Sequence, residues 1–316
     1  MSQSVKRIPA STTRMALSNV VRGRQSRPLR VMLYGVEGVG KSTFASQAPN
    51  PIFLCAEDGT SQLDVARFPS PATWLEVFEA LGVLMKEEHE FQTLVIDTLD
   101  WLEPLCWAHV CAQNGKGNIE DFGYGKGYVA ALDQWRMLVD RLDQLVRTKK
   151  MHVILIGHAA VRKIDDPHSG AYDRYRMKLH ERAGDLWREW VDAVLFARHE
   201  VFTVEKKGKQ RGVSSGRRVI HTQWNAAFDA KNRFDLPEQI DMDFAEFQRL
   251  CAGDDERIDA LRAEVESYIK KLAGSKYEAN PAKALEWAKR DIRNLKIALE
   301  KLSTQADEIA SEKAES

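Results

Sequence analysis

The sequence has 316 residues, 44% of them hydrophobic, and its 46 basic and 46 acidic side chains give a formal net charge of +0. This apolar content is enough for a buried core and excludes a chain that is disordered throughout. The charge is unevenly distributed, because residues 1–28 contain basic side chains and no acidic ones. We therefore expect a flexible basic arm over residues 1–28, followed by a folded body.

Apolar segments and amphipathic segments alternate from Leu29 onward. Short apolar runs predict strands at 29–34, 52–55, 93–96, 153–156 and 191–196. Helical periodicity separates them at 42–47, 74–85 and 129–146. Continuous apolar strands that alternate with helices are typical of an α/β fold, with a mostly parallel sheet covered on both faces.

The last third of the chain changes character twice. Segments 200–204 and 218–222 flank a Gly-, Lys- and Ser-rich turn and predict a β-hairpin extension of the sheet. From residue 254 a spacing of three and four predicts a C-terminal helical pair, packed within one chain or used for dimerisation. We expect a core over 29–252, and a helical hairpin with its tail over 253–316.

The cysteines and the longest apolar runs exclude several protein classes. Cys55, Cys106, Cys111 and Cys251 form no CxxC pair, which argues against a zinc site or a disulfide framework. No apolar run approaches the roughly 20 residues of a membrane span, and no apolar signal segment follows the basic start of the chain. We expect a soluble cytoplasmic protein without a membrane partner.

The segment directly after the first predicted strand carries the strongest motif. It reads G-V-E-G-V-G-K-S and matches G-x-x-x-x-G-K-[ST] between a strand and a helix, the context that a P-loop requires. Its backbone N–H groups can face phosphates, Lys41 can neutralise the β and γ phosphates, and Ser42 can offer a hydroxyl to Mg²⁺. We predict that ATP and Mg²⁺ bind here. The predicted ATP-binding residues are Gly35, Val36, Glu37, Gly38, Val39, Gly40, Lys41, Ser42 and Thr43.

Acidic residues follow two other predicted strands. Asp97 ends the apolar segment 93–96 and is either a Walker B carboxylate that joins Ser42 in the metal site or a cap of the next helix. Asp100 is expected to cap that helix. No acidic residue adjoins Asp97, so the catalytic base must lie elsewhere. Glu57 follows the second strand and can orient a water molecule, or be a solvated loop residue.

With these motifs, residues 29–250 resemble the RecA/RadA family, and within it the core-only RecA-like ATPases of bacteriophages that act in recombination and single-strand annealing. The resemblance rests on the P-loop, Asp97, Ala56-Glu57 and Ile156-Gly157-His158. It implies a RecA-like P-loop NTPase core in which Lys41 and Glu57 serve catalysis. It also implies that His158 senses the γ phosphate and couples it to a DNA-binding loop, although His158 can instead cap a strand end.

The resemblance places DNA-binding loops at 114–128 and 160–179. Both segments interleave cations with aromatic rings, a composition that suits single-stranded nucleic acid. A lid or a subunit contact is the alternative. The candidate DNA-binding residues are Lys116, Phe122, Tyr124, Lys126, Arg162, Lys163, Arg174, Arg176 and Lys178.

The resemblance further implies self-association, as a filament or a ring, with basic residues of the adjacent protomer completing each ATP site. Candidates for this trans contact are Lys206, Lys207, Lys231 and Arg233, and a solvated hairpin face is the alternative. An annealing or single-strand-binding protein is implied as a further partner. The helical pair replaces the DNA-binding domains that RecA and RadA carry beyond their cores.

The sequence therefore favours an ATPase that hydrolyses ATP to ADP and phosphate, is stimulated by DNA, assembles on single-stranded DNA and promotes recombination or annealing. If the chain is phage-encoded, it works in the host cytoplasm. The alternative is a P-loop motor or assembly ATPase, such as a helicase or a clamp-loader-like module, that acts on protein or duplex DNA.

Overall fold

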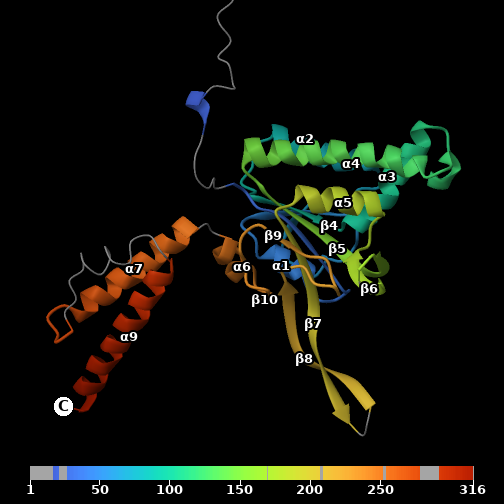
Figure 1. Cartoon of the computed structure of the whole chain (residues 1–316). Coiled ribbons are helices and arrows are strands. Elements are labelled where there is room, and N and C mark those ends of the chain that lie inside the picture. Colours follow the sequence, from blue (N-terminus) through green and yellow to red (C-terminus); the bar gives the residue numbers. More distant parts are fainter. Residues whose placement is uncertain are drawn as a thin grey trace, which may run out of the picture.

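The computed structural model describes residues 17–20, 27–168, 170–206, 209–251, 254–277 and 292–315. The predicted basic arm therefore lies outside the described residues, except for 17–20 and 27–28. Figure 1 shows a central sheet with helices on both of its faces, a long hairpin that projects from it, and a helical pair at the C-terminal end.

The described strands form one ten-stranded assembly in the order β10-β8-β7-β1-β5-β4-β2-β3, with β6 paired to β5 and β9 paired to β7. Their bounds are β1 Arg30–Gly35, β2 Pro51–Cys55, β3 Ala66–Arg67, β4 Thr93–Asp97, β5 His152–Asp166, β6 Gly170–Met177, β7 Ala193–Lys206, β8 Lys209–His221, β9 Lys231–Asn232 and β10 Gln239–Asp241. The α-helices are α1 Lys41–Ser46, α2 Trp74–Lys86, α3 Leu99–Gln113, α4 Lys126–Gln144, α5 Glu181–Trp190, α6 Phe244–Cys251, α7 Asp254–Leu272 and α9 Ile292–Glu315. Shorter helical turns are η1 Leu17–Asn19, η2 Ile119–Phe122 and η3 Leu145–Lys149.

The centre of the sheet is parallel, as the alternation of strands and helices predicts. Strand β1 lies between β5 and β7 and is parallel to both, and β5 separates β1 from β4. Because parallel strands end at the same edge, the residues after β1, β2, β4 and the core of β5 meet there. The predicted α/β fold, with its mostly parallel sheet, hairpin extension and C-terminal helices, is confirmed.

Each face of the sheet has its own apolar core. On one face, helices α2 to α5 pack around Trp74, Trp135 and Trp187, whose rings meet edge to face. On the other face, α1 and α6 bring Phe44 and Phe247 together below β1. Burial of large aromatic groups contributes several kcal/mol per side chain. Both cores therefore fix the parallel strands whose ends carry the predicted site.

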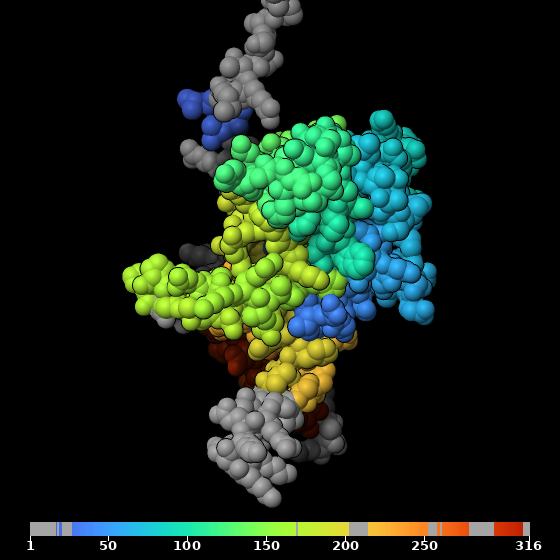
Figure 2. All heavy atoms as spheres, turned by 90° about the vertical axis from the view of Figure 1, so that its right-hand side faces the viewer, coloured from blue at the N-terminus to red at the C-terminus, as the bar shows by residue number. Residues whose placement is uncertain are grey.

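The fourth predicted strand is longer than its apolar segment suggests. It continues to Asp166 and pairs antiparallel with β6, so that Val161 faces Tyr175 and Lys163 faces Asp173. The expectation of a loop at 160–179 is therefore wrong for most of its length, since this segment is a β-hairpin. Figure 2 shows the hairpin, in yellow-green, standing out from the body of the molecule. Backbone pairing, which apolar periodicity does not report, stabilises this polar ladder.

The two predicted C-terminal features both occur. Strands β7 and β8 form the hairpin extension, which is longer than predicted, and α7 and α9 pack against each other within one chain. Val265, Leu272 and Leu295 are fully buried between these helices. Residues 278–291, between these two helices, lie outside the described residues. No helix in the described ranges is long and apolar enough to cross a membrane. The domain limits at residues 28 and 252 stay predictions.

Candidate functional site

The P-loop joins β1 to α1 and has the backbone shape that its glycines allow. Gly38 and Gly40 have positive φ angles of 70° and 96°, where other residues are strained. A Cβ atom on Gly35 would lie 2.1 Å from the carbonyl oxygen of Ala197 in β7. Val39, in the middle of the loop, is fully buried and anchors it to the core on the α1 face.

Lys41 is held against the inner side of this loop. Its Nζ donates to the carbonyl oxygens of Gly35 at 3.3 Å and Val36 at 3.0 Å, and the residue is buried. Burial lowers the pKa of Lys41, and the nearby carboxylates of Asp97 and Asp100 oppose this effect. The ammonium group therefore lies in a site where a phosphate would restore the interactions that burial removes.

Ser42 and Asp97 meet at the start of α1. The hydroxyl of Ser42 donates to Oδ2 of Asp97 at 2.6 Å. Burial raises the pKa of Asp97, while this hydrogen bond and the charge of Lys41 lower it. A hydroxyl and a carboxylate are the oxygen ligands that Mg²⁺ takes when phosphates and water supply the rest of its shell. In the described chain no group of three or more His, Cys, Asp or Glu could hold a metal alone, so this pair fits Mg²⁺ only together with a nucleotide.

Glu57, His158 and Asp100 form a line beside this pair. Nε2 of His158 lies 3.7 Å from Oε2 of Glu57, and its Nδ1 lies 2.9 Å from Oδ2 of Asp100. The hydrogen bond to Asp100 raises the pKa of His158, which favours the charged imidazolium between two carboxylates. The backbone N–H of Ala56 donates to the backbone carbonyl oxygen of Asp97 at 2.8 Å, which ties the end of β2 to the end of β4.

The expectation that Asp100 caps the next helix is wrong. Its Oδ1 accepts the backbone N–H of His158 at 3.0 Å, so that both carboxylate oxygens hold the residue at which β5 leaves the sheet. Sequence reasoning missed this role. Its signal was the position of Asp100, three residues after Asp97 at the edge of a parallel sheet.

Glu103 holds the other end of the hairpin, one turn further along α3. Both of its carboxylate oxygens accept the backbone N–H of His180 at 3.0 Å, just after β6 ends. Burial raises the pKa of Glu103 to about 7. The ring of His180 stacks on Tyr128 at 4.0 Å between centroids. Two acidic residues of the helix that follows Asp97 thus hold both roots of the β5–β6 hairpin, and no sequence motif marks Glu103.

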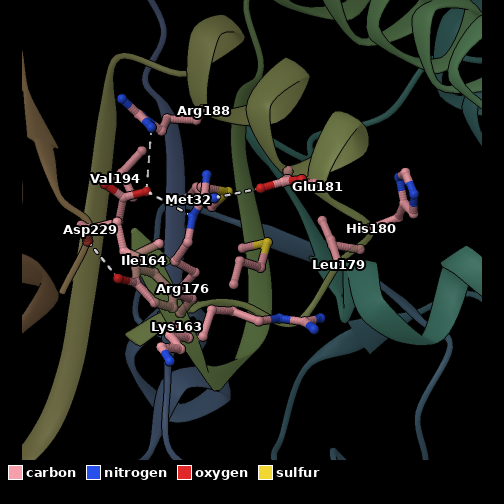
Figure 3. Close-up of a pocket in the computed structure, with 14 residues that line it drawn as sticks. Met32, Lys163, Ile164, Arg176, Leu179, His180, Glu181, Arg188, Val194 and Asp229 are labelled. Atoms are coloured by element: carbon pink, nitrogen blue, oxygen red, sulfur yellow. Dashed lines mark hydrogen bonds and ion pairs between the residues drawn. The ribbon is translucent and has the colours of Figure 1, made fainter. Parts of the chain in front are cut away.

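A cavity of about 340 Å³ lies between the root of this hairpin, α5 and the sheet. Figure 3 shows Met32 at its floor and Arg176 and Arg188 directed toward Asp229 on one side. Met32 belongs to the core of the α2–α5 face, so the cavity lies across the sheet from α1 and is separate from the P-loop.

The first segment of DNA-binding candidates is largely ordered into turns. Nζ of Lys116 lies 6.0 Å from the ring centroid of Phe122, and Lys126 begins α4. Tyr124 is fully exposed and has a positive φ of 50°. The structure thus offers an exposed ring and two cations at one end of the helical layer, and their role in DNA binding stays a prediction.

The cationic side chains of the second candidate segment, 160–179, fall into two groups. Arg174 donates to the carbonyl of Ala226 and stacks on Trp224, and Arg176 pairs with Asp185 at 2.8 Å. These two arginines hold the hairpin to the body. Arg162, Lys163 and Lys178 form the other group, because their side chains have no hydrogen bond or ion pair with any described residue.

The candidates for a trans contact lie in two places. Lys231 donates to carbonyls at the end of α5, including that of Val191 at 2.8 Å, and Arg233 pairs with the buried Asp192 at 3.1 Å. Both therefore have partners within the chain, at the edge of the sheet opposite the P-loop. Lys206 ends β7, but its side chain and the whole of Lys207 lie outside what the structure describes.

Comparison with protein families agrees with this geometry. A family model described as an AAA domain matches residues 27–234, which include the P-loop, Glu57, Asp97 and His158. The chain belongs to this AAA-domain family. It is a P-loop ATPase with an α/β fold.

Two further comparisons, with curated proteins and with solved structures, add little to this family assignment. No curated protein matches the sequence. Among solved structures, the crystal structure of the RadB recombinase is similar with a TM-score of 0.38 and 15% identity, over 67% of this chain and 86% of that one. A likeness of this size assigns no function to the chain.

Proposed function

We propose that this AAA-domain protein is a Mg²⁺-dependent ATPase that assembles on single-stranded DNA and promotes recombination or annealing. One observation carries the proposal. His158, which touches Glu57 beside the P-loop, is also the residue at which β5 leaves the sheet to form a cationic hairpin. A change at the γ phosphate can therefore reach the β5–β6 hairpin, the proposed nucleic-acid-binding element, through His158 and its hydrogen bonds.

The positions of the side chains support the proposed ATPase roles. Lys41 neutralises phosphate charge, and Ser42 and Asp97 hold Mg²⁺, which supplies further charge neutralisation when bound. Glu57 orients and deprotonates the attacking water, and His158 contacts the γ phosphate. Because Glu57 and His158 lie 3.7 Å apart, loss of the γ phosphate changes the charge next to both of them.

The DNA proposal rests on the charge and shape of the hairpin. Arg162, Lys163 and Lys178 form no ion pair with a described residue, although Asp173 faces Lys163 across the hairpin, and Tyr172 and Trp224 flank Arg174 nearby. Cations that follow phosphates and rings that stack on bases together favour single strands. The resemblance to core-only phage ATPases supports a phage origin and a single-strand annealing or single-strand-binding protein as partner.

Binding measurements across a salt series test this proposal. We expect single-stranded DNA to bind more tightly than duplex, with ATP increasing the affinity and a steep fall in affinity as salt rises. The charge-neutral variant Arg162→Gln/Lys163→Gln should weaken binding and reduce the salt slope by about 2. If single-stranded DNA neither binds nor stimulates ATP hydrolysis, the DNA proposal is rejected. Preference for duplex with directional movement would instead support the motor alternative.

Variants of the site test the ATPase roles separately. Lys41→Ala should abolish ATP binding, whereas Glu57→Gln should keep ATP affinity and lower turnover by about 100-fold or more. Asp58→Asn is the matched control, because Asp58 is the exposed neighbour of Glu57. Normal turnover of the Glu57 variant would show that another group acts as the base.

We also propose that the β7–β8 hairpin reaches a neighbouring protomer and supplies Lys206 or Lys207 to its ATP site, in a filament or a ring. The projection of this hairpin from the sheet in Figure 1 supports the idea. Mixing Lys41→Ala with Lys206→Ala/Lys207→Ala protein should restore part of the turnover, because one intact shared site can form in a mixed assembly. No recovery on mixing would argue against a trans contact.

A further inference from the structure

Arg218 lies on β8, in the part of the hairpin that borders the sheet. It pairs in register with His199 of β7, and Ile220, two residues along, packs in the core of the α1 face. Because side chains two apart in a strand lie on the same face, Arg218 also lies on the face that carries α1 and the P-loop.

The guanidinium of Arg218 covers the P-loop at Gly40. A Cβ atom built on Gly40 would lie 2.5 Å from Nη1 and 3.6 Å from Cζ of Arg218. Gly40 directly precedes Lys41, whose backbone opens α1. Strand β8 thus brings an arginine of the same chain next to the phosphate-binding loop.

This arginine has its hydrogen-bonding capacity unused. Arg218 is exposed, and among the described residues no hydrogen bond or ion pair to its side chain is found. Its neighbour Arg217 differs, because Arg217 pairs with Asp241 and lies near Glu200. Strand β8 therefore presents two adjacent arginines, one paired with acids and one, beside the P-loop, that has no such partner in the described part of the chain.

We propose that Arg218 binds the phosphate chain of the nucleotide held by the P-loop of its own chain. The planar guanidinium offers five donors that match phosphate oxygens in pairs, whereas Lys41 offers a point charge. The contact also links bound nucleotide to the β7–β8 hairpin, since Arg218 is part of its ladder. This inference rests on the proposed ATP site.

Titration calorimetry with three ligands tests the contact: a non-hydrolysable ATP analogue, ADP and inorganic tripolyphosphate. The last probe has phosphates but neither base nor ribose. We expect Arg218→Ala to weaken the analogue and tripolyphosphate by about 10- to 100-fold, as expected for charge-assisted hydrogen bonds. Arg218→Lys should recover part of the loss, because it keeps the charge but not the fork. Arg217→Ala is the matched control and should bind all three as the wild type does.

Each contrary outcome has a separate meaning. If Arg218→Ala binds the analogue and tripolyphosphate within two-fold of the wild type, the contact is refuted. If it loses the analogue but keeps tripolyphosphate, Arg218 touches base or ribose, and the phosphate assignment is overturned. If the wild type binds none of the ligands, the proposed ATP site itself fails. Thermal unfolding of both arginine variants checks that the fold is kept, and a folded Arg218→Gln serves as a second neutral variant.

Discussion

Replacing Glu103 by glutamine separates the charge of this side chain from its shape. Both carboxylate oxygens accept the backbone N–H of His180, and the side chain is buried between α3 and the end of β6. Glutamine keeps the size and a carbonyl acceptor but removes the titratable group. The substitution therefore tests whether the buried charge of Glu103, at the root of the β5–β6 hairpin, lowers the free energy of unfolding.

The magnitude follows from the pKa of Glu103, which burial raises from 4.5 to about 7. Each pKa unit corresponds to 1.36 kcal/mol, so the shift is equivalent to about 3 kcal/mol. Because the folded-state pKa is the higher one, the stabilising contribution is fully present below pH 4.5 and is lost as the pH rises through 7. The free energy of unfolding of the wild type should therefore fall relative to that of Glu103→Gln between these values.

Urea unfolding of both proteins between pH 5 and pH 8.5 measures this difference. We expect Glu103→Gln to gain up to about 3 kcal/mol over the wild type across this range, since all other titrating groups are shared. Glu88→Gln, at an exposed site, should follow the wild-type curve. Parallel pH dependences of the wild type and Glu103→Gln would refute the reasoning.

Three further substitutions address other contacts. Gly35→Ala places a Cβ 2.1 Å from the carbonyl oxygen of Ala197 and should lower the free energy of unfolding by about 1 to 3 kcal/mol in urea; an unchanged midpoint would contradict the close packing of β1 and β7. Asp192→Asn removes the buried carboxylate that three arginines share and should cost about 3 kcal/mol or more; a loss below 1 kcal/mol would show that the cluster is solvated. Asp100→Asn should keep ATP affinity within a few-fold but loosen the hairpin root at His158, seen as faster amide exchange in β5 and β6; unchanged exchange would argue against its positioning role.

The sequence was most informative where the chemistry is local. The P-loop is one contiguous segment between a strand and a helix, so glycine positions, Lys41 and Ser42 could be predicted together. Glu57, Asp97 and His158 could be predicted to meet because parallel strands end at one edge, and the structure does bring them together. The shared edge follows from the period of apolar residues and one rule of sheet topology, whereas the roles of Glu57 and His158 are implied by the resemblance to the RecA/RadA family.

The contacts that connect the P-loop site to the two hairpins depend on the tertiary structure. Asp100 and Glu103 carry no motif, and they gain their roles because α3 passes the two roots of a hairpin that apolar periodicity could not reveal. Arg218 reaches Gly40 only because β8 folds back beside β7. Local patterns report which segments bury apolar area, whereas pairings between residues far apart in the chain depend on how those segments pack.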